Sequence, residues 1–110
     1  MRFRLRTLMW DSIAAIVKKH AVLIQAVFAD GTKSEWSRWL TFPTDGYGEL
    51  ARFGPFKLED VERLEIDPVE TRRLGNRVPD KLVDHTDSIT RELASAGIEC
   101  ERNSSLLIIR

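Results

Sequence analysis

The chain has little of what marks a specialised class of protein. Its 110 residues include one cysteine, four prolines and six glycines, with no apolar run long enough to span a bilayer. The lone Cys100 cannot form an internal disulfide, which favours a reducing cytoplasm. Asp11 and Lys18 interrupt the first apolar stretch, which is not typical of a signal peptide. We therefore expect a cytoplasmic protein without a membrane span.

An excess of charge is also lacking, because 17 lysines and arginines balance 17 aspartates and glutamates. Net charge therefore gives no long-range steering onto nucleic acid. The chain is 43% hydrophobic and 31% charged, which is typical of a folded protein. At this length we expect one domain over residues 1–110, with one core.

Helical periodicity appears twice along the chain. It predicts a first helix over residues 8–19 and a second over 84–96, where Asp84 is the expected cap and Gly97 ends the helix. Before the first helix, arginines alternate with apolar residues over 2–6, which indicates an edge strand or a frayed end. The apolar face of the first helix comprises Met9, Ile13, Ile16 and Val17.

The strongest hairpin signal follows the first helix. A dense apolar run over residues 21–29 ends at Asp30 and Gly31, and an Asp-Gly pair suits a two-residue type I′ turn. We therefore expect a return strand over 32–42. With such a turn, Trp36 and Trp39 project from opposite faces of the sheet, so that one of them is exposed.

The rest of the chain gives further strands and one loop. Residues 64–67 predict a strand with charged side chains on an open face, and the Arg-, Gly- and Asn-rich stretch 69–79 predicts a long loop. Two terminal strands are expected at 98–101 and 106–110. The predicted fold is α+β, a mainly antiparallel sheet packed by two helices in the order (β)αβββαββ.

Five segments of the chain form a combination seen elsewhere: residues 39–42, 46–47, 54–55, 61–67 and 84–110. Together they resemble a bacterial family of small domains of unknown function, most specifically in the Gly-Pro turn that precedes an acidic strand. The chain differs from that family in having Arg63 where an aromatic residue is common, and in lacking a Gly-Tyr pair near the C-terminus. The resemblance implies this fold and a bacterial origin, and no catalytic residue. In size and composition the chain is also similar to immunity proteins of bacterial toxin systems.

Residues that could carry chemistry are few. His20, His85 and Cys100 lie far apart in the sequence, so we predict no metal site, no cofactor and no catalytic residue. Favourable charge at a helix end explains His20, and His85 is predicted to be a half-buried packing or capping residue. The acids of residues 59–70 are predicted to lie on a solvated face rather than in an acid-base site.

The charge pattern indicates a contact surface. Residues 59–70 hold six acids and one arginine. Mutual neutralisation with the basic residues that follow is the simplest explanation of this pattern. The sharper hypothesis is a non-enzymatic interaction module, such as an immunity or accessory protein, in which aromatic side chains anchor a basic protein partner and acids steer it. The predicted contact residues are Glu59, Glu62, Glu65, Asp67, Trp36, Trp39 and Tyr47.

Three alternatives remain open. Basic blocks at residues 2–19 and 72–81 would suit a nucleic-acid-associated domain if the fold joined them. An enzyme acting on a small ligand is the second alternative. The third is a homodimer formed through an uncovered strand edge. The basic surface of the second block comprises Arg72, Arg73, Arg77 and Lys81.

Overall fold

The computed structural model describes residues 7–110, so the predicted edge strand at 2–6 lies outside the described residues. Within the described part the fold is α+β, as predicted. In chain order the elements are α1 (Thr7–His20), β1 (Leu23–Phe28), β2 (Leu40–Thr41), β3 (Tyr47–Leu50), β4 (Phe53–Lys57), the 3₁₀ turn η1 (Leu58–Asp60), β5 (Val61–Asp67), β6 (Val69–Arg72), β7 (Lys81–Asp84), α2 (Thr86–Ser95), β8 (Glu101–Asn103) and β9 (Leu106–Ile109).

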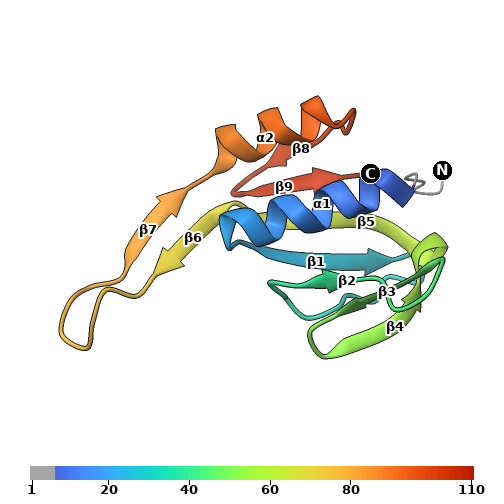
Figure 1. The fold of residues 1–110 in the computed structure, drawn as a ribbon, viewed down its shortest axis with the longest axis horizontal. Helices are drawn as coiled ribbons and strands as arrows, with labels where there is room; N and C mark the ends of the chain where they lie inside the picture. The colour runs from blue at the N-terminus through green and yellow to red at the C-terminus, as the bar shows by residue number, and fades with distance from the viewer. Residues whose placement is uncertain (1–6) are drawn as a thin grey trace.

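The strands form three antiparallel groups. The main sheet has the order β1-β5-β9-β8, a smaller sheet has the order β2-β3-β4, and β6 pairs with β7. Both helices pack on the main sheet (Figure 1), and their apolar stripes join the sheet in one core. Neither helix of residues 7–110 has the length and apolar character that crossing a membrane requires. The core includes Trp10, Ile13, Val17, Ile24, Leu64, Ile66, Ile89, Leu93, Leu107 and Ile109.

The first helix confirms its prediction closely. Ile13, Ile16 and Val17 recur at helical spacing and are buried on one face of α1. The helix ends where Ala21 adopts a left-handed conformation with φ of 52°. The amide of Val22 then donates to the carbonyl of Val17, which closes the last turn before β1 begins.

The second helix and the tail also follow the sequence, with shifted boundaries. Asp84 ends β7 rather than beginning α2, but its carboxylate accepts the amide of Thr86 at 2.9 Å and so still satisfies a free donor of the first turn. Gly97, with φ of 77°, ends the helix as predicted. The strand expected at 98–101 is wrong, because Ile98 packs in the core at the helix end and β8 begins at Glu101. The last strand, β9, lies inside the main sheet between β5 and β8.

The turn after β1 is not the predicted two-residue turn. The amide of Phe28 donates to the carbonyl of Thr32 at 2.8 Å, so three residues form the loop. Only Gly31 has positive φ, whereas a type I′ turn needs it at Asp30 as well. The Asp30 carboxylate instead accepts the Thr32 amide at 3.0 Å, which fixes the wider loop.

The predicted return strand over 32–42 is wrong for most of its length. Only isolated bridges join it to β1, at Lys33 and Ser37, and β2 pairs with β3 instead. A few backbone bonds to β1 remain, such as the pair exchanged by Ile24 and Ser37, and serine hydroxyls add to them: Ser34 accepts the amide of Ala26 at 2.9 Å, and Ser37 accepts the amide of Ala51 at 3.0 Å. Because the segment is irregular, both tryptophans are exposed, where only one was expected.

The loop expected at 69–79 is shorter than predicted. Its first four residues form β6, which pairs with β7, with Arg72 opposite Lys81 and Val69 opposite Asp84, and residues 73–80 form the connecting loop. We call residues 69–84 the arm. Figure 1 shows the arm projecting from one end of the molecule, and every residue from 71 to 82 is exposed.

Candidate functional site

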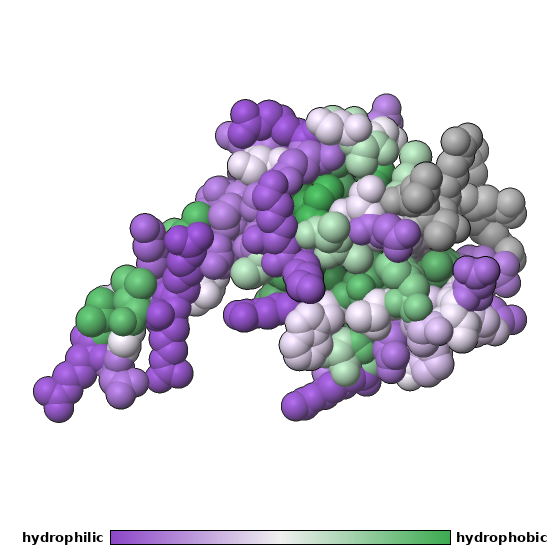
Figure 2. Space-filling model, in the orientation of Figure 1, coloured by the Kyte–Doolittle hydropathy of each residue, from purple (hydrophilic) through white to green (hydrophobic). Residues whose placement is uncertain are grey.

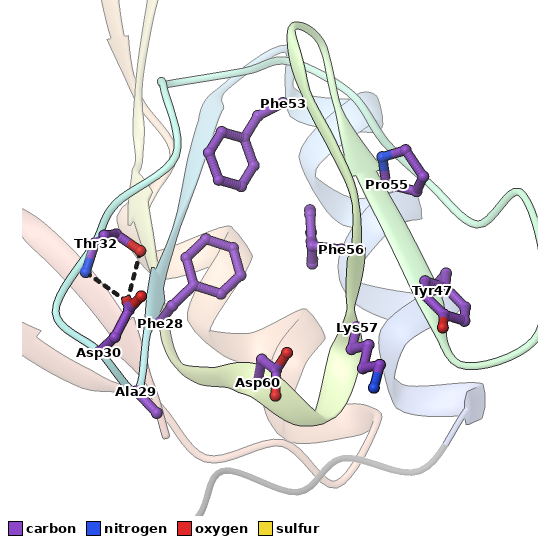
Figure 3. Close-up of a pocket in the computed structure, with 10 residues that line it drawn as sticks. All are labelled: Phe28, Ala29, Asp30, Thr32, Tyr47, Phe53, Pro55, Phe56, Lys57 and Asp60. Carbon is purple, nitrogen blue, oxygen red and sulfur yellow. Dashed lines mark hydrogen bonds between the residues drawn. The ribbon is translucent and has the colours of Figure 1, made fainter.

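An open pocket lies between the end of β1 and strand β4. Its volume is about 600 Å³, within the range of roughly 300–1,000 Å³ typical of ligand pockets. Figure 3 shows its walls, in which aromatic rings face one another and charged side chains stand at the edge. We call it the aromatic pocket; it is lined by Phe28, Ala29, Asp30, Thr32, Tyr47, Phe53, Pro55, Phe56, Lys57 and Asp60.

Three phenyl rings form the apolar wall of the aromatic pocket. Phe28 stacks on Phe53 with ring centroids 5.3 Å apart, and it meets Phe56 edge-on at 5.2 Å. Phe53 and Phe56 are themselves 5.9 Å apart. Offset and edge-on contacts of this kind are the favourable arrangements of aromatic pairs, so the rings hold one another in place.

An irregularity in β4 puts two of these rings on the same side. Residues three apart on a regular strand point to opposite faces. Here Gly48 is paired with Phe56 and Leu50 with Phe53, so β4 carries one extra residue, and Gly54 adopts φ of 121°. The bulge restores both rings to one face.

Gly48 makes room for the pocket wall. A Cβ atom at this position would lie 2.8 Å from Cδ2 of Leu58 and 3.1 Å from the ring of Phe56. The Phe56 ring therefore lies directly on the backbone of β3. Glycine is the residue that allows this close approach.

The rim of the aromatic pocket is mainly acidic. Thr32 donates to the Asp30 carboxylate through its hydroxyl at 2.6 Å and through its amide at 3.0 Å, and these bonds lower the pKa of Asp30. The carbonyl of Asp60 accepts the amide of Ala29 at 3.0 Å, so the turn and η1 are tied together. Among the residues that the structure describes, Lys57 is the one cationic residue that lines the pocket. The site therefore offers an apolar cup with two carboxylates and one ammonium.

The predicted contact residues divide among several places. Tyr47 lines the aromatic pocket, and Glu59 is exposed on η1 beside the pocket residue Asp60. Glu62 is exposed at the start of β5, two residues further on. Tyr47 is thus part of the pocket, while Glu59 and Glu62 lie near its lining residue Asp60 in the chain.

The other predicted acids do not lie on an open face. Glu65 is buried, and its carboxylate lies 3.3 Å from Nε of Arg63 and 3.9 Å from Nζ of Lys33. Lys33 belongs to the irregular segment after β1, which bridges to β1 at Lys33 and Ser37 and so brings this ammonium within reach of Glu65. Asp67, at the far end of β5, is half-buried and accepts the amide of Val69 at 3.1 Å.

The tryptophans belong to the irregular segment after β1 and are not among the residues that line the pocket. Trp36 and Trp39 expose 37% and 61% of their surface. The residues that do form the pocket wall were missed by sequence reasoning. The phenylalanines that flank Gly54-Pro55 were the available signal, because two large apolar side chains beside a turn need a place to pack.

Comparison with known families assigns the chain. A family model matches residues 5–110, which is nearly the whole length. The chain belongs to DUF6678, a family of unknown function. The predicted resemblance to a family of small domains of unknown function is thereby confirmed. Searches of curated proteins and of solved structures gave no match.

A second polar cluster in this DUF6678 member joins both helices to the arm. The rings of His20 and His85 lie 4.8 Å apart. Nε2 of His20 is bonded to Glu92 of α2, and Nε2 of His85 lies 2.8 Å from Glu70 of β6. The two histidines are 65 positions apart in the sequence, so no local pattern could predict their contact. We call these four residues the histidine cluster.

Basic side chains complete the histidine cluster at both ends. Nζ of Lys19 lies 2.6 Å from the Glu92 carboxylate and, with His20, lowers the pKa of Glu92. Arg72 lies 2.9 Å from Glu70, and with His85 it lowers the pKa of Glu70 to about 2. The cluster holds the base of the arm against the ends of the helices. Among the described residues, no group of His, Cys, Asp and Glu has the arrangement of a metal site.

The predicted basic surface of residues 72–81 lies on the arm. Arg73 and Arg77 are in the connecting loop, while Arg72 and Lys81 face each other across the ribbon. The end of α1 lies near the base of the arm, but Lys19 there is already bound to Glu92.

Proposed function

We propose that this domain is a protein-interaction module that binds a basic segment of a partner protein in the aromatic pocket. The observation that carries the proposal is the combination of three mutually packed phenyl rings with the Asp30 and Asp60 carboxylates at the rim. Glu59 and Glu62, which flank Asp60 closely in the chain, are both exposed. The site retains part of the acidic and aromatic surface predicted from the sequence.

The chemistry of the pocket suits an arginine or lysine beside an apolar residue. Phenyl faces attract a guanidinium or ammonium group, at about 0.5–1 kcal/mol in exposed sites. The aliphatic stems of these residues also gain from contact with the rings. Carboxylates at the rim favour approach of a positive segment and set its orientation. Because the rings already pack on one another, little ordering is needed on binding.

An immunity or accessory protein in a bacterial cytoplasm is the specific role that we propose within this class. A toxin with a basic surface is a partner of the required chemistry. The unpaired Cys100 agrees with a reducing compartment. A toxin gene beside the gene for this protein, and capture of that toxin by the pocket, would support the role.

A peptide titration tests the pocket directly. Isotope-labelled protein is titrated with the peptide Leu-Arg-Leu-Arg and, separately, with Leu-Glu-Leu-Glu, while amide resonances are followed. We expect the basic peptide to shift resonances of Phe28, Tyr47 and Phe56 and the acidic peptide to leave them unchanged. Weak, micromolar to millimolar binding is expected from so small a ligand.

A matched pair of variants controls for general charge effects. Asp60→Lys reverses charge at the rim and should abolish the shifts caused by the basic peptide. Glu99→Lys makes a similar change at an exposed position between α2 and β8 and should leave them intact. Equal binding of both peptides, or shifts confined to residues outside the pocket, would refute the proposal.

A further inference from the structure

Exposed apolar side chains gather in two separate places on this molecule. One group belongs to the arm, where Figure 2 shows apolar atoms bounded by polar ones. The other group belongs to residues 36–47 and includes Tyr47 of the aromatic pocket. Among the described residues, the large apolar side chains left exposed are Leu74, Val78 and Leu82 on the arm, and Trp36, Trp39 and Tyr47. The apolar group on the arm, exposed and surrounded by polar atoms, is typical of an interaction site.

The two places carry opposite charge. Arg73, Arg77 and Lys81 of the arm form no ion pair with any residue of 7–110, and Lys81 lies directly opposite Arg72. Like charges opposite each other destabilise a two-stranded ribbon, so the pair is not explained by the stability of the arm. The aromatic pocket, in contrast, has Asp30 and Asp60 on its rim, with Glu59 beside them in the chain.

The two places lie at opposite ends of an elongated molecule. Its principal extents are 45, 29 and 23 Å. Along the longest axis, Figure 1 shows the arm at one end and the connection from β4 to β5, which bears Asp60, toward the other. The arm of one copy therefore cannot fill the pocket of the same copy.

We propose that the arm of one copy docks in the aromatic pocket of a second copy. This inference rests on the proposed function, because it names the partner of the same pocket. Leu74 and Val78 enter the cup of phenyl rings, and Arg73 and Arg77 meet Asp60 and Glu59 at the rim. The zero net charge supports a second copy as the occupant, because identical chains without net charge do not repel one another over distance.

The chemistry of the arm favours a protein surface over nucleic acid. Phosphate contacts would use Arg73 and Arg77 but would leave three exposed apolar side chains without a partner. Arg72 is already bound to Glu70, and Asp80 lies in the same loop. The pocket satisfies both the charge and the apolar part of the arm.

The contact is heterologous, since different surfaces of the two copies meet. In a pair joined by one such contact, one copy keeps an unused pocket and the other keeps an unused arm, so association continues into chains or closes into rings. Electrostatic approach makes it sensitive to salt. It does not use the edge of the main sheet, where β8 is short and fully exposed.

Sedimentation velocity on the full chain tests the inference. We expect the weight-average mass to rise above the 12.6 kDa of one chain as concentration increases, and to fall when salt is raised from about 0.05 to about 0.5 M. The arm variant R73E/R77E and the pocket variant E59K/D60K should each weaken association by at least about tenfold. The combined four-fold variant should restore it, because the charges are exchanged. Arg91→Glu on α2 and Glu99→Lys are the matched controls and should associate like the original chain.

Several results would overturn the inference. They are a monomeric chain at all concentrations, association that neither variant changes, or a four-fold variant that stays as weak as the single sets. Binding of mixed DNA or of anionic vesicles by a monomeric protein, lost in the arm variant, would assign the arm to those partners instead. A monomeric chain that still binds Leu-Arg-Leu-Arg in the pocket would overturn self-association alone and leave the proposed function standing. Far-UV circular dichroism confirms that each variant is folded.

Discussion

Charge reversal at Glu65 should destabilise the protein strongly, whereas the same change at Glu62 should not. The two acids lie three residues apart on β5, but Glu65 is 6% exposed and Glu62 is exposed. In Glu65→Lys, the new ammonium replaces a carboxylate that lies 3.3 Å from Arg63 and 3.9 Å from Lys33. Three cations then share one site without an acid between them.

The expected cost follows from the burial of each partner. Removing one member of a buried ion pair costs about 3–5 kcal/mol. The side chain of Lys33 is 51% exposed and can turn into solvent, so we expect about 3 kcal/mol, at the low end. Glu62→Lys should change stability by less than about 0.5 kcal/mol. Glu65→Gln keeps an acceptor for Arg63 and should fall between the two.

Urea unfolding measures the difference. With a slope of about 1–3 kcal/mol per M, the midpoint of Glu65→Lys should fall by roughly 1–3 M and that of Glu62→Lys should hardly move. Tryptophan fluorescence and far-UV circular dichroism should report the same transition. If Glu65→Lys lowered the free energy of unfolding by less than about 1 kcal/mol, this carboxylate would be solvated and the reasoning from its burial would be wrong.

Three further predictions concern the sheet, the pocket and the pH dependence. Deleting residues 106–110 removes the interior strand β9 with its buried Leu107, Ile108 and Ile109, and should abolish cooperative urea unfolding. Deleting Arg110 alone should preserve it. A cooperative transition in the chain that lacks 106–110 would refute the sheet order. Gly48→Ala should lower the free energy of unfolding by about 1–3 kcal/mol and weaken binding of Leu-Arg-Leu-Arg, because its Cβ would lie 2.8 Å from Leu58; an unchanged midpoint would contradict the close packing. Arg72, and then His85, lower the pKa of Glu70 from 4.5 to about 2. The stability that this group contributes is therefore present above pH 4.5 and is lost as pH falls toward 2. A Glu70→Gln variant should lack that part of the acid dependence of the urea midpoint.

The parts of the fold that the sequence predicted well depend on local signals. The stripe of Ile89 and Leu93 and the left-handed Gly97 act within a few residues, so α2 and its end were predictable. The turn at Asp30 was not, because the same Asp-Gly pair permits two loop lengths, and the bonds from Thr32 to Asp30 favour the longer. The arm was missed for another reason. A ribbon exposed on both faces has no buried side, so its sequence shows no apolar alternation.

The candidate site was less predictable, because it depends on contacts between distant residues. Alternation places Phe53 and Phe56 on opposite faces, and only the bulge at Gly54 brings them together. Glu65 has the sequence context of an exposed strand residue, yet it is buried and its carboxylate lies near Lys33, 32 positions earlier. Tyr47 was chosen as an aromatic anchor of a contact surface, and it lines the pocket.

The balanced charge of this chain has a different meaning in three dimensions than in the sequence. Counted along the sequence, 17 basic and 17 acidic residues cancel, so net charge does not steer the protein onto nucleic acid. In the fold, Asp60 of η1 lines the aromatic pocket, and Arg73 and Arg77 lie on the arm toward the other end of the molecule. The histidine cluster fixes this arrangement, since His85 and Glu70 at the base of the arm contact His20 and the helices behind it. An arm held in a set direction loses less freedom on docking than a mobile loop would, and this makes contact between a short arm and a shallow pocket energetically feasible.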